Sequence, residues 1–169
     1  MNADKIYLVG FMGAGKTTVA RALARRLGWR AVDIDELIEQ RERHTVTDLF
    51  AKRGEAYFRA VERAVLLDLV ALRHAVVATG GGTFVDPQNR AVMLQDGLTV
   101  WLDLPLEGLI ARVPADGRRP LAADRLEFER LYALRRPAYA QAHVRIDAQR
   151  VPVASIVEQV VDEVDKVGQ

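Results

Sequence analysis

The feature that most constrains this chain is the segment 10–17, which reads Gly-Phe-Met-Gly-Ala-Gly-Lys-Thr and fits the pattern G-x-x-x-x-G-K-[ST]. It follows a short apolar run, residues 5–9, and precedes a run with helical spacing that ends at Gly28. In such a setting the glycines let successive backbone N–H groups surround phosphate oxygens, and the helix adds its positive end. The sequence therefore predicts a site for a nucleoside triphosphate, with Lys16 at the outer phosphates and Thr17 on Mg²⁺.

Apolar runs alternate with helical patterns along the rest of the chain. We expect strands at residues 5–9, 30–33, 75–78, 98–102 and 144–146. We expect helices at 17–27, 36–43, 45–51, from 55 to about 72, from 87, at 106–112, up to about 142 with an interruption at Pro137, and at 152–164. This alternation is typical of a parallel sheet with helices on both faces. It predicts one α/β domain over residues 1–169.

Composition excludes several classes of protein. The 169 residues contain no cysteine and only three scattered histidines, which argues against disulfide scaffolds, thiolate chemistry and a histidine-built metal centre. The 24 basic and 23 acidic side chains give a net charge of +1, whereas a general nucleic-acid binder needs a large basic excess. No apolar run approaches the roughly 20 residues that span a bilayer. We therefore expect a soluble cytoplasmic protein with no nucleic-acid or membrane partner.

Two carboxylates, Asp33 and Asp35, stand where the second predicted strand ends. Ligands of open α/β sheets gather at the carboxyl ends of the strands, so both should face the phosphate loop. One could hold a magnesium-bound water while the other orients or deprotonates an acceptor hydroxyl. The alternative is helix capping, because Asp33 and Glu36 have the spacing of a capping box.

Two further features have both a structural and a functional interpretation. Arg59 lies at the start of the long helix, where it could bind a ligand or pair with Glu55 and Glu62 on a solvated helix face. The Gly80–82 run after the third strand could let a substrate approach the backbone closely, or it could be a flexible turn. The residues alone leave both alternatives open.

Arginines gather in the second half of the chain. The glycine- and proline-containing segment 113–123 carries Arg118 and Arg119, as expected of a lid that closes over transferring phosphate. Arg135 and Arg136 have no acid at helical pairing distance and are candidates for binding an anionic ligand. Residues 112–136 hold seven arginines and four acids, so the near-neutral total conceals a local cationic region.

Taken together, these motifs resemble the shikimate kinase family over nearly the whole chain. The matching segments are 10–18, Asp33-x-Asp35, Gly54-Glu55-x-x-Phe58-Arg59, Gly80-Gly81-Gly82, Arg119-Pro120-Leu121 and Arg135-x-Pro137-x-Tyr139. The resemblance implies a three-layer P-loop kinase fold with a five-stranded parallel sheet in the order 2-3-1-4-5. It also implies Mg²⁺- and ATP-dependent phosphorylation of the shikimate 3-hydroxyl, on the route to chorismate, by a monomer.

The resemblance also implies roles for individual residues. The ATP phosphates would lie against Gly13, Ala14, Gly15, Lys16, Thr17 and Thr18, and the adenine against Arg112, Arg150 and Pro152. Thr17 and Asp33 would hold the metal ion, and Arg119 would reach the phosphates from the lid at about 113–123. Shikimate would contact a substrate-binding segment at about 34–62, the glycine turn and one arginine near the end of the chain's long charged helix. The residues in contact would be Asp35, Phe50, Phe58, Arg59, Gly80, Gly81, Gly82 and Arg135. Lys16, Asp35 and Arg119 would be catalytic.

The motif selects Arg135 rather than Arg136, because it counts two residues back from Pro137. Two departures are slight: Ile34 is bulkier than the residue usual between the aspartates, and Ala122 replaces a common leucine. Two alternatives stay open. One is a gluconate kinase-like enzyme, which also needs arginines around a carboxylate; the other is a nucleotide-binding module without turnover.

Overall fold

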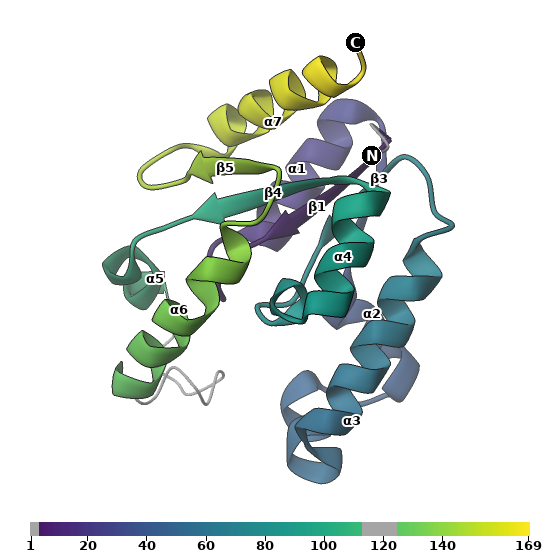
Figure 1. Cartoon of the computed structure of the whole chain (residues 1–169), viewed down its shortest axis with the longest axis vertical. Helices are drawn as coiled ribbons and strands as arrows, with labels where there is room; N and C mark the ends of the chain where they lie inside the picture. Colours follow the sequence, from purple (N-terminus) through teal and green to yellow (C-terminus); the bar gives the residue numbers. More distant parts are fainter. Residues whose placement is uncertain (1–3, 113–124) are drawn as a thin grey trace.

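In the computed structural model, residues 4–112 and 125–169 are described, and they form a parallel sheet covered by helices (Figure 1). The strands are β1 Lys5–Val9, β2 Arg30–Asp33, β3 Ala75–Ala78, β4 Leu98–Asp103 and β5 Val144–Asp147. The helices are α1 Lys16–Leu27, α2 Ile34–Glu42, α3 Val46–Leu69, the 3₁₀ turn η1 Thr83–Val85, α4 Pro87–Asp96, α5 Leu106–Arg112, α6 Arg125–Tyr139 and α7 Val153–Val167. The strand order β2-β3-β1-β4-β5 confirms the expected topology.

The sheet is buried from both sides. All residues of β1, β3 and β4 are buried, as expected of apolar runs that pack under helices on two faces. Helices α1 and α7 pack together on one face, while α4 and α6 lie on the other (Figure 1). This is the three-layer arrangement that the alternation of elements predicted. Among the described residues, no helix is both long and apolar enough to cross a membrane.

Several element boundaries differ from those expected. Helix α2 begins at Ile34, directly after β2, because the side chain of Asp33 caps it. Gly54 interrupts α3 with a φ of 83° and ψ of 171°, which confirms the expected break between two helical pieces. Pro137 lies inside the last turn of α6 instead of interrupting a longer helix, and α6 ends at Tyr139. The Gly80–82 run leads into η1, which was not expected.

The parallel strands bring the candidate residues to one edge. The carboxyl end of β1 leads into the phosphate loop, that of β2 ends at Asp33, and that of β3 leads into the glycine turn. Strand β4, which pairs with β1 on the side away from β3, ends at Asp103. Ligands of open α/β sheets bind at this edge, so the fold itself places the site.

Candidate functional site

The phosphate loop joins β1 to α1 and has the backbone geometry that the motif requires. Gly13 and Gly15 have φ values of 83° and 91°, which side-chain-bearing residues rarely adopt. Lys16 is buried, and its ammonium donates hydrogen bonds to the carbonyl oxygens of Gly10 and, at 3.1 Å, of Phe11. The loop is therefore preformed at the N-terminus of α1, where backbone N–H groups and a buried cation favour a polyphosphate.

Asp33 caps α2, as the capping-box spacing allowed, and it also contacts the phosphate loop. One oxygen accepts the backbone N–H of Glu36 at 3.1 Å and caps α2, while the other accepts the Thr17 hydroxyl at 2.6 Å. The two residues thus present a hydroxyl and a carboxylate side by side at the phosphate loop. The described residues contain no cluster of three or more His, Cys, Asp or Glu side chains arranged to hold a metal. Mg²⁺ nonetheless needs few protein ligands, because phosphate and water oxygens supply most of its coordination. One hydroxyl and one carboxylate therefore fit such a site.

Asp35 is the most unusual side chain of the site. Its Oδ1 atom is buried and is the one buried side-chain polar atom in 4–112 and 125–169 without a hydrogen-bond partner. Burial, and then the neighbouring Asp33 charge, raise the pKa of Asp35 to about 6, against the opposing effect of Lys16. The orphaned oxygen lies 3.0 Å from where a side chain on Gly80 would begin. Such an acceptor is suited to a hydroxyl from a ligand.

Arg59 pairs with both of its helical neighbours, of which Glu55 is exposed and Glu62 is buried. Its Nε lies 3.6 Å from Glu55, and its Nη1 lies 3.0 Å from Glu62. The Glu62 side chain is only 1% exposed, and its other oxygen accepts the Thr83 hydroxyl at 2.8 Å. Glu62 was missed as a site residue, since its only sequence signal was the three-residue spacing from Arg59. It fixes the Arg59 guanidinium beside Gly82, where an added Cβ would lie 2.5 Å from Nη2.

Arg135 meets the same glycine turn from the other side. Its Nη1 lies 3.0 Å from where a Cβ on Gly81 would be, and its guanidinium is 5.9 Å from the centre of the Phe11 ring. Burial, and to a lesser degree the Arg59 charge, lower the pKa of Arg135. Within the described part of the chain, no ion pair joins Arg135 to a carboxylate. Arg59 and Arg135 thus form a pair of cations suited to one shared anion.

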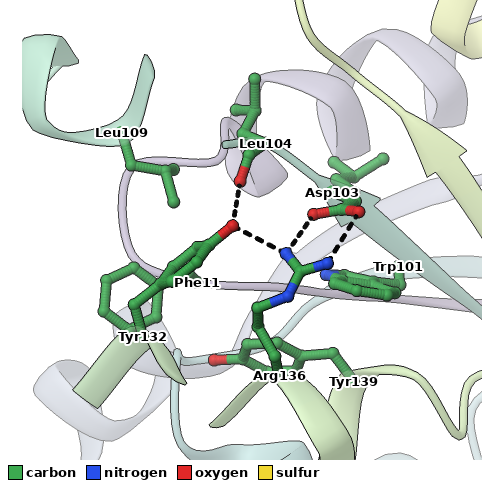
Figure 2. Close-up of a pocket in the computed structure, with 9 residues that line it drawn as sticks. Phe11, Trp101, Asp103, Leu104, Leu109, Tyr132, Arg136 and Tyr139 are labelled. Atoms are coloured by element: carbon green, nitrogen blue, oxygen red, sulfur yellow. Dashed lines mark hydrogen bonds and ion pairs between the residues drawn. The ribbon is translucent and has the colours of Figure 1, made fainter. Parts of the chain in front are cut away.

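Arg136, the alternative to Arg135, has a structural partner that the sequence did not reveal. Figure 2 shows its guanidinium reaching Asp103 at the end of β4, with Nη1 2.8 Å from Oδ1. The two partners are 33 positions apart in the sequence, so a search for partners at helical spacing could not find this pair. The geometry therefore agrees with the choice of Arg135 for ligand binding.

The remaining candidates are spread around the site. Phe50 and Phe58 pack together with ring centres 4.7 Å apart, Phe58 buried and Phe50 partly exposed. The Arg112 guanidinium lies on the phosphate loop, 3.3 Å from the Gly13 carbonyl oxygen. Thr18 is exposed on the first turn of α1, and both Arg150 and Pro152 are exposed between β5 and α7. Arg118, Arg119 and the expected lid at 113–123 lie outside the described residues.

Comparison with known proteins agrees with this geometry. A family model described as shikimate kinase matches residues 12–165. A shikimate kinase of Persephonella marina is 42% identical over 156 residues, which cover 92% of this chain and 95% of the relative. The structure of a shikimate kinase from Acinetobacter baumannii in complex with shikimate superposes with a TM-score of 0.91 at 35% identity, over 96% of this chain and 93% of that one.

A gluconokinase from Sinorhizobium meliloti has a TM-score of 0.59 at 16% identity, over 98% of this chain and 93% of that one. At that identity the likeness extends to the fold alone. The family match and the relative at 42% identity, by contrast, each extend over most of the sequence. The chain belongs to the shikimate kinase family.

Proposed function

We propose that this chain transfers the γ-phosphoryl group of ATP to the 3-hydroxyl of shikimate, giving ADP and shikimate 3-phosphate for the synthesis of chorismate and aromatic amino acids. The observation that carries the proposal is the orphaned carboxylate oxygen of Asp35. It lies against Gly80, in the same glycine turn that Arg59 and Arg135 contact, and the Lys16 charge of the phosphate loop acts on it. The phosphate loop suits ATP, and the two arginines suit a carboxylate. Shikimate joins a carboxylate and hydroxyls on one ring, so it fits both ends.

On the phosphate side, the residues Gly13 to Thr18 would hold the ATP phosphates through backbone N–H groups. Lys16 would leave the carbonyl oxygens of its own loop for the outer phosphates, which offer a full negative charge in their place. Thr17 and Asp33 would hold Mg²⁺ together with the phosphates. When bound, Mg²⁺ neutralises charge that develops on the transferring group.

On the acceptor side, Asp35 would accept a hydrogen bond from the 3-hydroxyl and take its proton as the phosphoryl group transfers. With a pKa raised to about 6, the carboxyl is ionised at neutral pH yet more basic than an ordinary aspartate. Turnover at low substrate should therefore increase with pH through about 6. Positioning and electrostatics supply most of the rate enhancement in this kind of reaction.

The ring would be held by contacts on three sides. Arg59 and Arg135 would bind the carboxylate, with Gly81 and Gly82 leaving room for both guanidinium groups, as the short distances to an added Cβ indicate. Gly80 would keep the space beside Asp35 open. The Phe50 and Phe58 rings would form the apolar wall, in the segment at about 34–62 that we propose as the substrate-binding part of a single domain.

Three further parts of the proposal concern the nucleotide. Arg112, Arg150 and Pro152 would contact the adenine, and the position of Arg112 beside the phosphate loop supports its part in this. Arg119 would approach the phosphates from a lid at about 113–123. We propose that the protein works as a monomer. We place it in the cytoplasm, where ATP and Mg²⁺ are available.

A coupled assay of ADP release tests the proposal. With Mg-ATP present, shikimate should stimulate ADP release, while gluconate at the same concentration should not, and chelation of Mg²⁺ should abolish the activity. Stimulation by gluconate instead would identify a sugar-acid kinase. ATP binding without release of ADP under any of these conditions would indicate a binding module and would contradict the proposal.

A further inference from the structure

A cluster of charged side chains around a buried carboxylate at the carboxyl end of β4 lies next to the proposed shikimate site but outside it. At its centre is Asp103, whose side chain is 7% exposed. Its Oδ1 accepts a hydrogen bond from Arg136 Nη1 at 2.8 Å, and its Oδ2 accepts one from Arg145 Nε at 2.7 Å (Figure 2 shows the Arg136 pair). One carboxylate thus holds one arginine from α6 and one from β5.

Arg136 is held by more than this ion pair. Its Nη1 also donates to the Tyr132 hydroxyl at 2.7 Å, and that hydroxyl donates to the Leu104 carbonyl oxygen at 2.9 Å. The guanidinium lies 4.9 Å from the centre of the Trp101 ring. Figure 2 shows these groups converging from α6 and from the end of β4. Side chains one turn apart on α6 are thus attached to the same short stretch of β4 and the loop that follows it.

Arg135, the residue before Arg136 on α6, points in a different direction. Successive side chains of a helix project about 100° apart. With Arg136 directed at Asp103, Arg135 is directed toward Phe11 and Gly81. Arg135 is also repelled by Arg59 across the glycine turn, as the lowered pKa of Arg135 reflects after the larger effect of burial. The Arg136 pair, together with the Tyr139 hydroxyl that donates a hydrogen bond to the Gly81 carbonyl oxygen, attaches this part of α6 to the sheet and the glycine turn.

We propose that Arg136 and Asp103 are positioning residues for shikimate binding: their ion pair attaches α6 to β4 so that the neighbouring Arg135 faces the substrate carboxylate. This inference rests on the proposed function. It assigns to Arg136 a role through Arg135, without contact with the substrate. Arg145 shares the Asp103 carboxylate but belongs to β5, so it does not attach α6 and provides a matched control.

The test compares steady-state kinetics of Arg136→Gln, Arg136→Lys and Arg145→Gln. Arg136→Gln should raise the KM for shikimate about tenfold, as expected for one weakened charge-assisted contact, and leave the KM for ATP within about twofold. Arg136→Lys should restore part of the loss, because lysine keeps the charge but not the planar fork. Arg145→Gln should change neither constant by more than about twofold.

A double-mutant cycle distinguishes positioning from a general structural role. If Arg136 acts through Arg135, Arg136→Gln should add almost nothing to the shikimate KM in an Arg135→Ala background. Additive effects, an unchanged KM in Arg136→Gln, or an equal effect of Arg145→Gln would overturn the proposal. The wild-type activity with shikimate tests the proposed function separately, so the two can fail independently. ATP affinity of each variant shows that the protein is folded.

Discussion

Replacing Asp35 by asparagine should make the protein more stable and much less active. In the wild-type protein the Asp35 carboxyl is buried beside Asp33, and one of its oxygens has no hydrogen-bond partner. A neutral amide of the same shape avoids the cost of an ionised group at that position. It also removes the group that would accept the proton of the 3-hydroxyl. Stability and activity should therefore change in opposite directions.

The size of the gain follows from the pKa. Folding raises the pKa of Asp35 from 3.8 to about 6, so the folded protein binds this proton more tightly than the unfolded chain does. The free energy of unfolding therefore falls as pH rises through this window, by about 3 kcal/mol in total from this group. Asparagine does not titrate. The variant should be more stable by up to about 3 kcal/mol at pH 7.5, and the difference should shrink between pH 6 and pH 4.

Thermal unfolding at pH 7.5 and pH 4 measures this difference. For a chain of this size, 3 kcal/mol corresponds to roughly 6–12 °C in Tm. Asp86→Asn is the control: Asp86 caps α4 and pairs with Arg63, and hydrogen bonds from Asn89 and Gln88 lower the pKa of Asp86 despite partial burial. That variant should gain no stability at pH 7.5. No rise in Tm for Asp35→Asn at pH 7.5, or the same rise at both pH values, would refute the reasoning, as would near-normal turnover.

Three further substitutions test other parts of the structure. Arg59→Ala should raise the KM for shikimate roughly tenfold or more and barely change the KM for ATP, because it removes a charge-assisted contact to the carboxylate. Steady-state kinetics with each substrate varied test this, and an unchanged KM for shikimate would contradict it. Gly82→Ala should also raise the KM for shikimate, since the new Cβ would lie 2.5 Å from Arg59 Nη2, while the φ of −103° is one that alanine adopts without strain. Gly108→Ala is the control: beyond its adjacent residues and its own helix backbone, its Cβ would have no neighbour closer than 3.7 Å, so the KM should not change. Lys5→Met should lower the free energy of unfolding, measured by denaturant titration, by about 3 kcal/mol, because the buried Asp96 carboxylate loses its ammonium partner at 2.7 Å. Adding Asp96→Asn to that variant should recover part of the loss.

Much of the fold was predictable because its signals are local. The strands β1, β3 and β4 are short, mostly apolar runs, and the residue that ends β2, Asp33, caps the helix that follows it. The break at Gly54 was predictable for the same reason, since a φ of 83° suits glycine. The order of the strands came from the family resemblance instead. No local pattern specifies which strands are neighbours.

The missed features all depend on partners far apart in the chain. Lys5 is fully buried because it meets Asp96, which is 91 residues away. Glu62 stood three residues from Arg59 and suggested an exposed pair, but Thr83 and the glycine turn cover it. Arg136, like Arg135, had no acid at helical spacing, and only the fold shows that β4 brings Asp103 against it. The residue types in the sequence indicate which side chains could bind a ligand or catalyse a reaction. Contacts between distant parts of the chain determine which of those side chains lie at the candidate site.

The position of the phosphate in the product tests the central claim most directly. If Arg59 and Arg135 hold the carboxylate while Asp35 faces the 3-hydroxyl, a complete turnover of shikimate with Mg-ATP should yield one phosphomonoester. Phosphorus–proton coupling in its NMR spectrum should place the ester on carbon 3 alone. A mixture of esters, an ester on another hydroxyl, or no phosphorylated shikimate would contradict the arrangement proposed for the site.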